Sequence, residues 1–92
     1  MGEMIHQDRL KRIANREDHQ CFACGPGNDC GLKMTFFTDE TAVYSWLSPA
    51  GHHRGWDRLV HGGITATVLD EIMSWAAIYL LKKVILTKQM TV

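Results

Sequence analysis

The feature that most constrains this chain is an apolar helix with a carboxylate in its middle. The hydrophobic pattern predicts a helix from Ile64 to about Lys83. Apart from the lysines at its end, its ionisable side chains are those of Asp70, Glu71 and Tyr79. The residues three and four positions from Asp70 include no cation, so no ion pair within the helix accounts for its charge. Because burying an unpaired charge is costly, Asp70 must find other partners or line a cleft.

Three residues directly before this helix, His61, Gly62 and Gly63, form a turn suited to holding an anion. Paired glycines let a ligand approach the backbone closely. The free N–H groups at a helix N-terminus favour negative charge. The turn therefore has the parts of an oxyanion hole for acyl transfer. A plain loop-to-helix turn with a chance histidine is the alternative interpretation.

The spacing of these groups bears on how they could act together. Asp70 follows His61 by nine residues, which places the two about half a turn out of phase and ~13 Å apart along the helix axis. The two side chains of one copy are therefore too far apart to act on one small substrate. If both serve one site, they come from different subunits, and a symmetric dimer with paired helices would have two equivalent sites.

Composition predicts one small domain without a nucleic-acid partner. The chain has 92 residues, 46% of them apolar, and a formal net charge of zero, whereas domains that bind nucleic acid through bulk charge are usually strongly basic. The first 18 residues are polar and lack the apolar segment of a signal peptide. The apolar helix is interrupted by Asp70 and Glu71, so it is not interpreted as a membrane span. We therefore expect a cytoplasmic protein.

Hydrophobic spacing predicts a small α+β domain. We expect a weak amphipathic helix over residues 4–16, a β-hairpin with strands over 32–38 and 41–47, and a further strand over 84–92. Glycine-rich loops are expected over 21–31 and 48–59. A helix that is apolar nearly all round must be covered on every side. Three strands supply about half of that cover, so we expect other chains to supply the rest or the sequence to be incomplete.

A cluster of sulfur and imidazole groups lies in the first of these loops. His19, Cys21, Cys24 and Cys30 have the right number and type of ligands for zinc. Their compact spacing is not that of a common zinc finger, and an odd number of cysteines without an export signal favours reduced thiols. We therefore expect small thiols that pack the loop, and no metal.

Two motifs resemble those of a known family. The first, C-F-A-C-G-x2-N-x2-G-L, begins at Cys21, and the second, G-W-x3-V-H-G-G-I-x-A-T-x-L-D-E-x-M-x-W-A, begins at Gly55. Together they resemble the hotdog-fold acyl-CoA thioesterases of the phenylacetate-degradation type, in the subgroup with an N-terminal CFxCG and NxxGL segment. The resemblance covers residues 21–92 and leaves 1–20 as an extension. It implies an antiparallel sheet wrapped round one long helix, with two copies forming two active sites between them. Family members continue through two further strands, so it also implies that the last strands are missing here.

The resemblance also implies roles for individual residues. Asp70 matches the catalytic acid, which acts as general base or nucleophile toward the thioester. His61, Gly62 and Gly63 match the turn that polarises the thioester carbonyl. The expected substrate-binding positions are Arg54, Gly55, Trp56, Thr67 and Thr87. Arg54 stands where the subgroup usually has glutamine.

The expected function is hydrolysis of an acyl-CoA to a carboxylate and CoA, by a homodimer or a homotetramer built as a dimer of dimers, without a cofactor. Two other functions stay open. One is a non-catalytic hotdog-like module that binds acyl-CoA or mediates assembly, and the other is a small zinc-binding domain. Turnover of an acyl-CoA, affinity without turnover, and about one bound metal with chelator sensitivity would distinguish the three.

Overall fold

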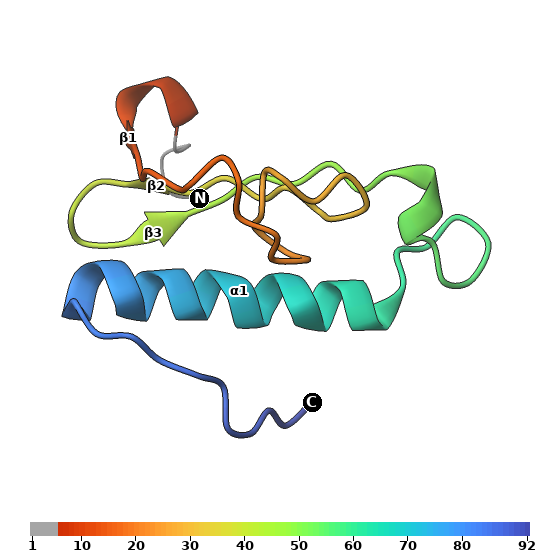
Figure 1. Ribbon diagram of the computed structural model, residues 1–92. Coiled ribbons are helices and arrows are strands. Elements are labelled where there is room, and N and C mark those ends of the chain that lie inside the picture. The colour runs from red at the N-terminus through yellow and green to blue at the C-terminus, as the bar shows by residue number, and fades with distance from the viewer. Residues whose placement is uncertain (1–5) are drawn as a thin grey trace, which may run out of the picture.

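The computed structural model describes residues 6–92, which form a helix layer and a sheet layer. Helix α1 (Gly62–Leu81) runs along one side, and a three-stranded antiparallel sheet with its connecting loops lies against it (Figure 1). The sheet has the order β1-β2-β3. The remaining elements are β1 (Lys11–Arg12), β2 (Phe37–Thr38), β3 (Val43–Tyr44) and the 3-10 helices η1 (Gln7–Arg9) and η2 (Gly51–His53). The prediction of an α+β domain is therefore confirmed.

Helix α1 confirms the long helix predicted from the hydrophobic pattern. It begins at Gly62, two residues before the predicted start, because His61 caps it through its side chain. Lys82 adopts the left-handed conformation (φ 57°) just after the last helical residue, which is a common way for a helix to end. The helix and the β-hairpin are thus the elements that the sequence locates best.

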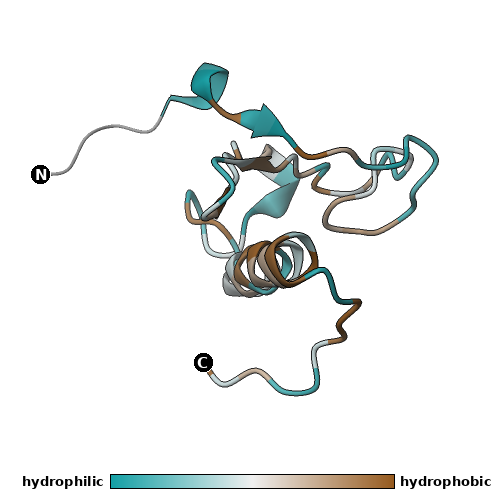
Figure 2. Ribbon diagram, turned by 90° about the vertical axis from the view of Figure 1, so that its left-hand side faces the viewer, coloured by the Kyte–Doolittle hydropathy of each residue, from teal (hydrophilic) through white to brown (hydrophobic). Residues whose placement is uncertain are grey.

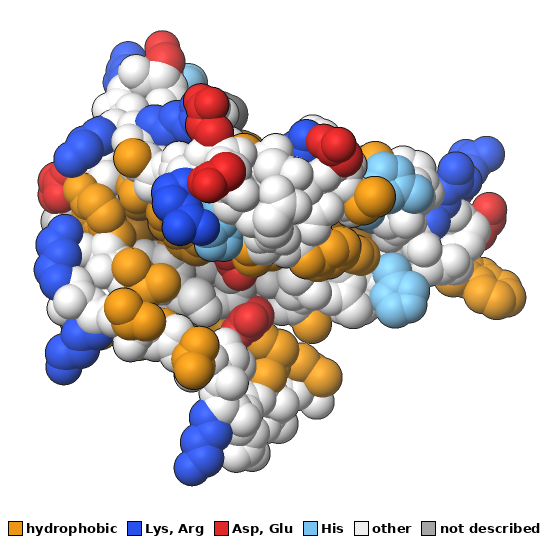
Figure 3. All heavy atoms as spheres, viewed as in Figure 1, with side chains coloured by type: hydrophobic (Ala, Val, Ile, Leu, Met, Phe, Trp, Pro, Cys, Tyr) orange, Lys and Arg blue, Asp and Glu red, His pale blue; other side chains and the backbone are white. Residues whose placement is uncertain are grey.

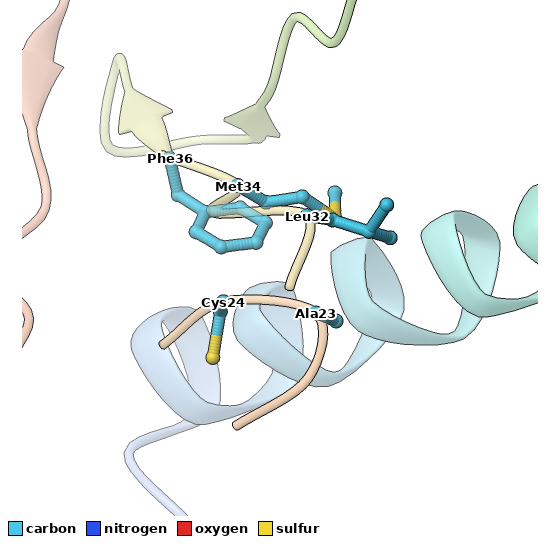
Figure 4. Close-up of a cluster of buried hydrophobic side chains, with 5 residues drawn as sticks. All are labelled: Ala23, Cys24, Leu32, Met34 and Phe36. Carbon is cyan, nitrogen blue, oxygen red and sulfur yellow. The ribbon is translucent and has the colours of Figure 1, made fainter. Parts of the chain in front are cut away.

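One face of α1 packs against a buried cluster in the opposite layer. Ile64, Val68, Ile72 and Trp75 lie at the helical spacing that forms one stripe, and all four contact this cluster. The Trp75 ring stacks on Phe36 with 4.5 Å between ring centroids and 12° between ring planes. Figure 4 shows Leu32, Met34 and Phe36 above the helix and Ala23 and Cys24 across it, and these five residues form the cluster.

The predicted hairpin is present, with shorter strands than expected. Phe37 pairs with Tyr44 and Thr38 with Val43. The Asp39 side chain organises the turn, because its Oδ1 accepts hydrogen bonds from the Thr41 amide and hydroxyl and from the Ala42 amide. Its Oδ2 accepts one from the Tyr44 hydroxyl at 2.9 Å. A single carboxylate therefore joins the turn to the returning strand.

The weak helix predicted over residues 4–16 is wrong for the part that the structure describes. Residues 4 and 5 lie outside the described range, η1 is a single 3-10 turn, and β1 follows it directly. Lys11 pairs with Thr38 and Arg12 with Phe37, and the Ile13 amide donates to the Phe36 carbonyl at 2.8 Å. Pairing with β2 gives this segment hydrogen bonds to the sheet, whereas an isolated helix of this length would be only marginally stable.

The strand predicted over residues 84–92 is also wrong. This segment turns back along the side of α1 that faces away from the sheet and has no strand structure (Figures 1 and 2). Alternating apolar residues form a strand only where another strand offers hydrogen-bond partners, and none of the described strands lies on this side. Val84 and Leu86 are each 92% exposed, and hydrophobic side chains lie at the surface of this part of the molecule (Figure 3). The sheet therefore covers one side of α1, and a sheet wrapped round the helix stays a prediction.

By length and composition alone, α1 could cross a membrane. Helix α1 meets both conditions even though Asp70 and Glu71 interrupt its apolar sequence. Helices in the cores of soluble proteins meet the same two conditions, so this finding does not decide where the protein is located.

An exposed polar network joins the end of α1 to the sheet layer. The Tyr79 hydroxyl donates to the Glu40 carboxylate at 2.8 Å, and the Lys11 ammonium donates to the Tyr79 oxygen at 3.3 Å. The Lys82 ammonium lies 4.1 Å from the centroid of the Tyr79 ring. Tyr79, which the sequence marked as one of three ionisable groups in the helix, thus has a structural partner from β1 and another from the hairpin turn.

Replacing Phe36 with alanine should lower the free energy of unfolding by about 3–5 kcal/mol, because the side chain is 2% exposed and loses its stack on Trp75. Chemical denaturation measures this change. Trp56→Ala is the matched control, since that aromatic side chain is 82% exposed and should change stability by less than about 0.5 kcal/mol. Equal effects of the two substitutions would contradict the described core.

Acid should destabilise the chain partly through Asp39. The hydrogen bonds from Thr41, Ala42 and Tyr44 hold the pKa of this carboxyl below its ordinary value. Folding thus favours the ionised form, so the stabilisation is present above the unfolded-state pKa of about 3.9 and is lost as pH falls through the lower folded pKa. As the pH is lowered from about 6 to about 2, the melting temperature of Asp39→Asn should therefore fall less than that of the wild type.

Asp57→Asn is the control for this measurement, because it makes the same chemical change at an exposed carboxylate outside the hairpin turn. Its melting temperature should follow that of the wild type across the pH range. A pH dependence of Asp39→Asn identical to that of the wild type would remove Asp39 from the acid response.

Candidate functional site

The loop before α1 holds the His61-Gly62-Gly63 turn in place. The His61 amide donates to the carbonyl of the buried His53 at 2.9 Å, and the Gly55 amide donates to the Leu59 carbonyl at 2.9 Å. A Cβ atom at Gly55 would lie 2.9 Å from the His61 Cα. Only glycine therefore allows this close approach, and the roles of His53 and Gly55 here are structural.

The turn offers fewer free donors than the sequence suggested. The Gly63 N–H donates to His61 Nδ1 at 2.9 Å, so it is already engaged. Among residues 6–92, the Gly62 N–H has no acceptor, and a Cβ at Gly62 would meet nothing within 4 Å. Because His61 Nδ1 accepts a hydrogen bond, the neutral ring carries its proton on Nε2. The groups free to bind an anion are thus the Gly62 amide and His61 Nε2–H.

Asp70 lies on the side of α1 that faces away from the sheet. Its half-buried carboxylate accepts a hydrogen bond from the Thr87 hydroxyl at 2.5 Å. Within the described chain, no lysine, arginine or histidine nitrogen forms an ion pair with it. The sequence associated Asp70 and Thr87 with one site, and the structure brings them together.

Asp70 and Thr87 line a pocket of about 280 Å³ between α1 and the C-terminal segment. Its other lining residues were not identified from the sequence, because they depend on how the segment after the helix folds back. They are Met73, Ser74, Ile85, Gln89, Met90 and Thr91.

A second pocket, of about 350 Å³, lies between α1 and the sheet layer. Ile64, Val68 and Ile72 line it from the helix, and Met34 and Leu47 line it from the opposite layer. These residues give it the mostly apolar lining that is typical of small-molecule sites. Since its helical residues belong to the stripe that packs on the sheet, it lies on the other side of α1 from Asp70.

The other expected substrate-binding residues do not converge on Asp70. The exposed Arg54 donates from Nε to the Gly51 carbonyl at 3.0 Å. Trp56 extends into solvent from the same loop and covers neither pocket. The Thr67 hydroxyl donates to the Gly63 carbonyl at 2.8 Å, a bond within the helix. One copy of the chain therefore does not assemble the complete expected site.

The cysteine-rich loop forms a separate cluster. One ligand atom each from His19, Cys21 and Cys24 lie within 4.8 Å of one another. Cys30, expected as the fourth member, is exposed, and its amide donates to Asn28 Oδ1 at 3.0 Å. Glu71 of α1 approaches the cluster instead, because the Cys21 thiol donates to Glu71 Oε1 at 3.7 Å.

Glu71 was not assigned to this cluster from the sequence. The sequence does place Glu71 in an apolar helix, four residues before Trp75, and this spacing could have indicated a contact between the two side chains. In the structure, the Trp75 Nε1–H donates to Glu71 Oε1 at 3.1 Å. Burial, followed by the hydrogen bonds to Glu71 and Cys21, raises the pKa of the Cys24 thiol well above its ordinary value. This thiol therefore stays protonated as the structure stands.

Comparison with family models, with curated proteins and with solved structures finds no match for this chain.

Proposed function

We propose that this protein hydrolyses an acyl-CoA thioester to a carboxylate and CoA. The observation that carries the proposal is the environment of Asp70. This half-buried carboxylate has no ion-pair partner among the described residues, accepts a hydrogen bond from Thr87, and lines a pocket. A carboxylate placed in this way is suited to accept a proton, as a general base does.

The chemistry requires two sets of groups. Asp70 takes a proton from a water molecule as the water oxygen attacks the thioester carbonyl, and the Thr87 hydroxyl orients the carboxylate. The Gly62 N–H and His61 Nε2–H stabilise the negative charge that develops on the carbonyl oxygen. Collapse of the tetrahedral intermediate breaks the carbon–sulfur bond, and the CoA thiolate takes up the proton held by Asp70. The carboxylic acid product then releases its own proton to solvent and becomes the carboxylate. Direct attack by Asp70, giving an anhydride that water then hydrolyses, is the alternative route.

The proposal requires a second copy of the chain. Within one copy, Asp70 and His61 are separated by about two and a half turns of α1 and lie out of phase. The side of α1 that carries Asp70 also exposes Leu69 and Met73, which are 53% and 58% exposed. Residues 84–92 also lie on this side of α1, so a partner helix would pack beside that segment or displace it. Pairing of this kind would bring the His61 turn of one copy toward Asp70 of the other. A two-fold dimer would then contain two equivalent sites.

One observation favours the alternative of a binding module without turnover. The apolar pocket of about 350 Å³ could hold an acyl chain, and it lies on the opposite side of α1 from Asp70. A ligand held there would be away from the proposed base. Acyl-CoA binding without hydrolysis would support this second function, and the hotdog arrangement would then serve recognition or assembly.

Asp70→Asn should reduce hydrolysis of an acyl-CoA by about 10²–10⁴-fold, the usual contribution of one positioned acid–base group. Release of free thiol from a panel of acyl-CoA substrates measures the rate, and circular dichroism checks the fold. Asp57→Asn is the matched control and should retain the wild-type rate, because Asp57 lies in the exposed loop. Equal rates for wild type and Asp70→Asn would remove Asp70 from the mechanism.

Mixing two inactive variants should restore activity if the site is shared between copies. His61→Ala and Asp70→Asn each damage both sites of their own dimer, but a mixed dimer keeps one wild-type site. Random exchange places about half of the dimers in the mixed state, with one good site of two, so activity should approach about a quarter of wild type.

Native mass spectrometry of the mixture is the control for subunit exchange, and the two unmixed variants give the baseline. If mixed dimers form and no activity returns, the shared site is wrong. His61 would then have to be removed from the chemistry or placed in the same site as Asp70 of its own chain.

A further inference from the structure

Four potential metal ligands from two distant parts of the sequence converge beside the buried cluster. His19, Cys21 and Cys24 come from the turn-rich loop, and their ligand atoms lie within 4.8 Å of one another. Glu71 comes from α1, and its Oε1 lies 3.7 Å from Cys21 Sγ. In Figure 4 the Cys24 side chain points from the loop toward the helix. The proposed hydrolysis uses none of these groups.

We propose that His19, Cys21, Cys24 and Glu71 bind one zinc ion, which joins the turn-rich loop to helix α1. This differs from the expectation of loop-packing thiols, and it replaces Cys30 with Glu71 in the ligand set. The site is independent of the proposed hydrolysis, so either can fail without the other.

The backbone of the loop already has a shape that directs the sulfur atoms to one point. The Cys24 amide approaches Cys21 Sγ at 3.5 Å, and the Gly25 amide donates to the Cys21 carbonyl at 2.8 Å. A Cβ atom at position 25 would collide with the His19 carbonyl oxygen, so glycine is required for this tight turn. The Cys24 N–H could still donate to the Cys21 sulfur when that sulfur binds a metal as the thiolate.

The charges of the cluster favour a cation. A carboxylate and two thiols lie close together, and no described lysine or arginine forms an ion pair with Glu71. A bound divalent ion would pair with the carboxylate and with both sulfurs as thiolates, so all three groups would share one counter-charge.

The ligand types and their number favour zinc in a closed site. Sulfur, imidazole and carboxylate ligands in fourfold coordination are those of tetrahedral zinc, and Zn–S bonds of about 2.3 Å place the two sulfurs roughly 3.8 Å apart. The ligand atoms of His19, Cys21 and Cys24 already lie within 4.8 Å of one another, and Glu71, which is outside that group, would have to move closer to complete the site. His19 would bind through Nε2, or through Nδ1 after giving up the Cys21 amide, which now donates to Nδ1 at 3.2 Å. The Trp75 Nε1–H bond to Glu71 would orient the carboxylate from the outer shell.

Metal analysis and cobalt spectroscopy of the whole chain, purified under reducing conditions, test this proposal. We expect about one zinc per chain, and Co²⁺ should give the visible absorption bands of a tetrahedral site with thiolate ligands. Cys24→Ser should weaken binding by more than the roughly 10–100-fold typical of outer-shell changes, and so should Glu71→Gln. Cys30→Ser is the matched control and should bind as the wild type does.

A second measurement needs no variant. Adding zinc to the reduced chain should slow alkylation of Cys21 and leave alkylation of the exposed Cys30 unchanged, as read by mass spectrometry of the peptides. Failure of the reduced wild-type chain to bind either metal would overturn the proposal. Loss of binding in Cys30→Ser, or wild-type affinity in Glu71→Gln, would also overturn it, because the ligand set would then be wrong.

Discussion

The stack of Trp75 on Phe36 is the contact on which the arrangement of this molecule depends. It joins the middle of the long helix to the residue that leads into β2, and the stripe of Ile64, Val68 and Ile72 extends the same contact toward the helix start. This contact fixes the rotation of α1 about its axis. Successive side chains on a helix are about 100° apart. Once the rotation is fixed, Asp70 lies on the side of α1 opposite the sheet, and Glu71 lies on the side that faces the cysteine-rich loop.

The sequence predicts the elements whose signals are local. The helix follows from a long apolar pattern with glycines before it, and the hairpin follows from two β-rich runs around Asp39 and Glu40. The failures are segments whose structure depends on a partner. Residues 84–92 alternate as a strand does, yet no described strand lies beside them. Lys11 and Arg12 have no strand pattern, yet they pair with β2. Such pairing is decided by the tertiary arrangement, which a local pattern does not contain.

In the candidate sites, too, the sequence indicates which residues could take part but does not indicate the contacts that depend on the tertiary arrangement. Asp70 and Thr87 were both assigned to the expected site through the family resemblance, but the hydrogen bond between them was not predicted, because it depends on how residues 84–92 fold back. The engagement of the Gly63 amide by His61 depends on one side-chain rotamer, which the sequence does not specify. Glu71 could not be separated from Asp70 by composition, since both are carboxylates in one apolar helix. Only the contacts with Cys21 and Trp75 distinguish its surroundings.

The division of α1 into two faces makes the length of this helix more critical than the identity of many of its residues. An inserted or deleted residue just before Asp70 would turn everything after it by about 100° relative to everything before it. Trp75 would then leave Phe36 if the first half kept its place, and Ile64 and Val68 would leave the cluster if the second half did. An exposed residue such as Met73 can be exchanged without this effect. Within α1, natural variation should therefore take the form of substitutions, and changes of length should fall in the loops at either end.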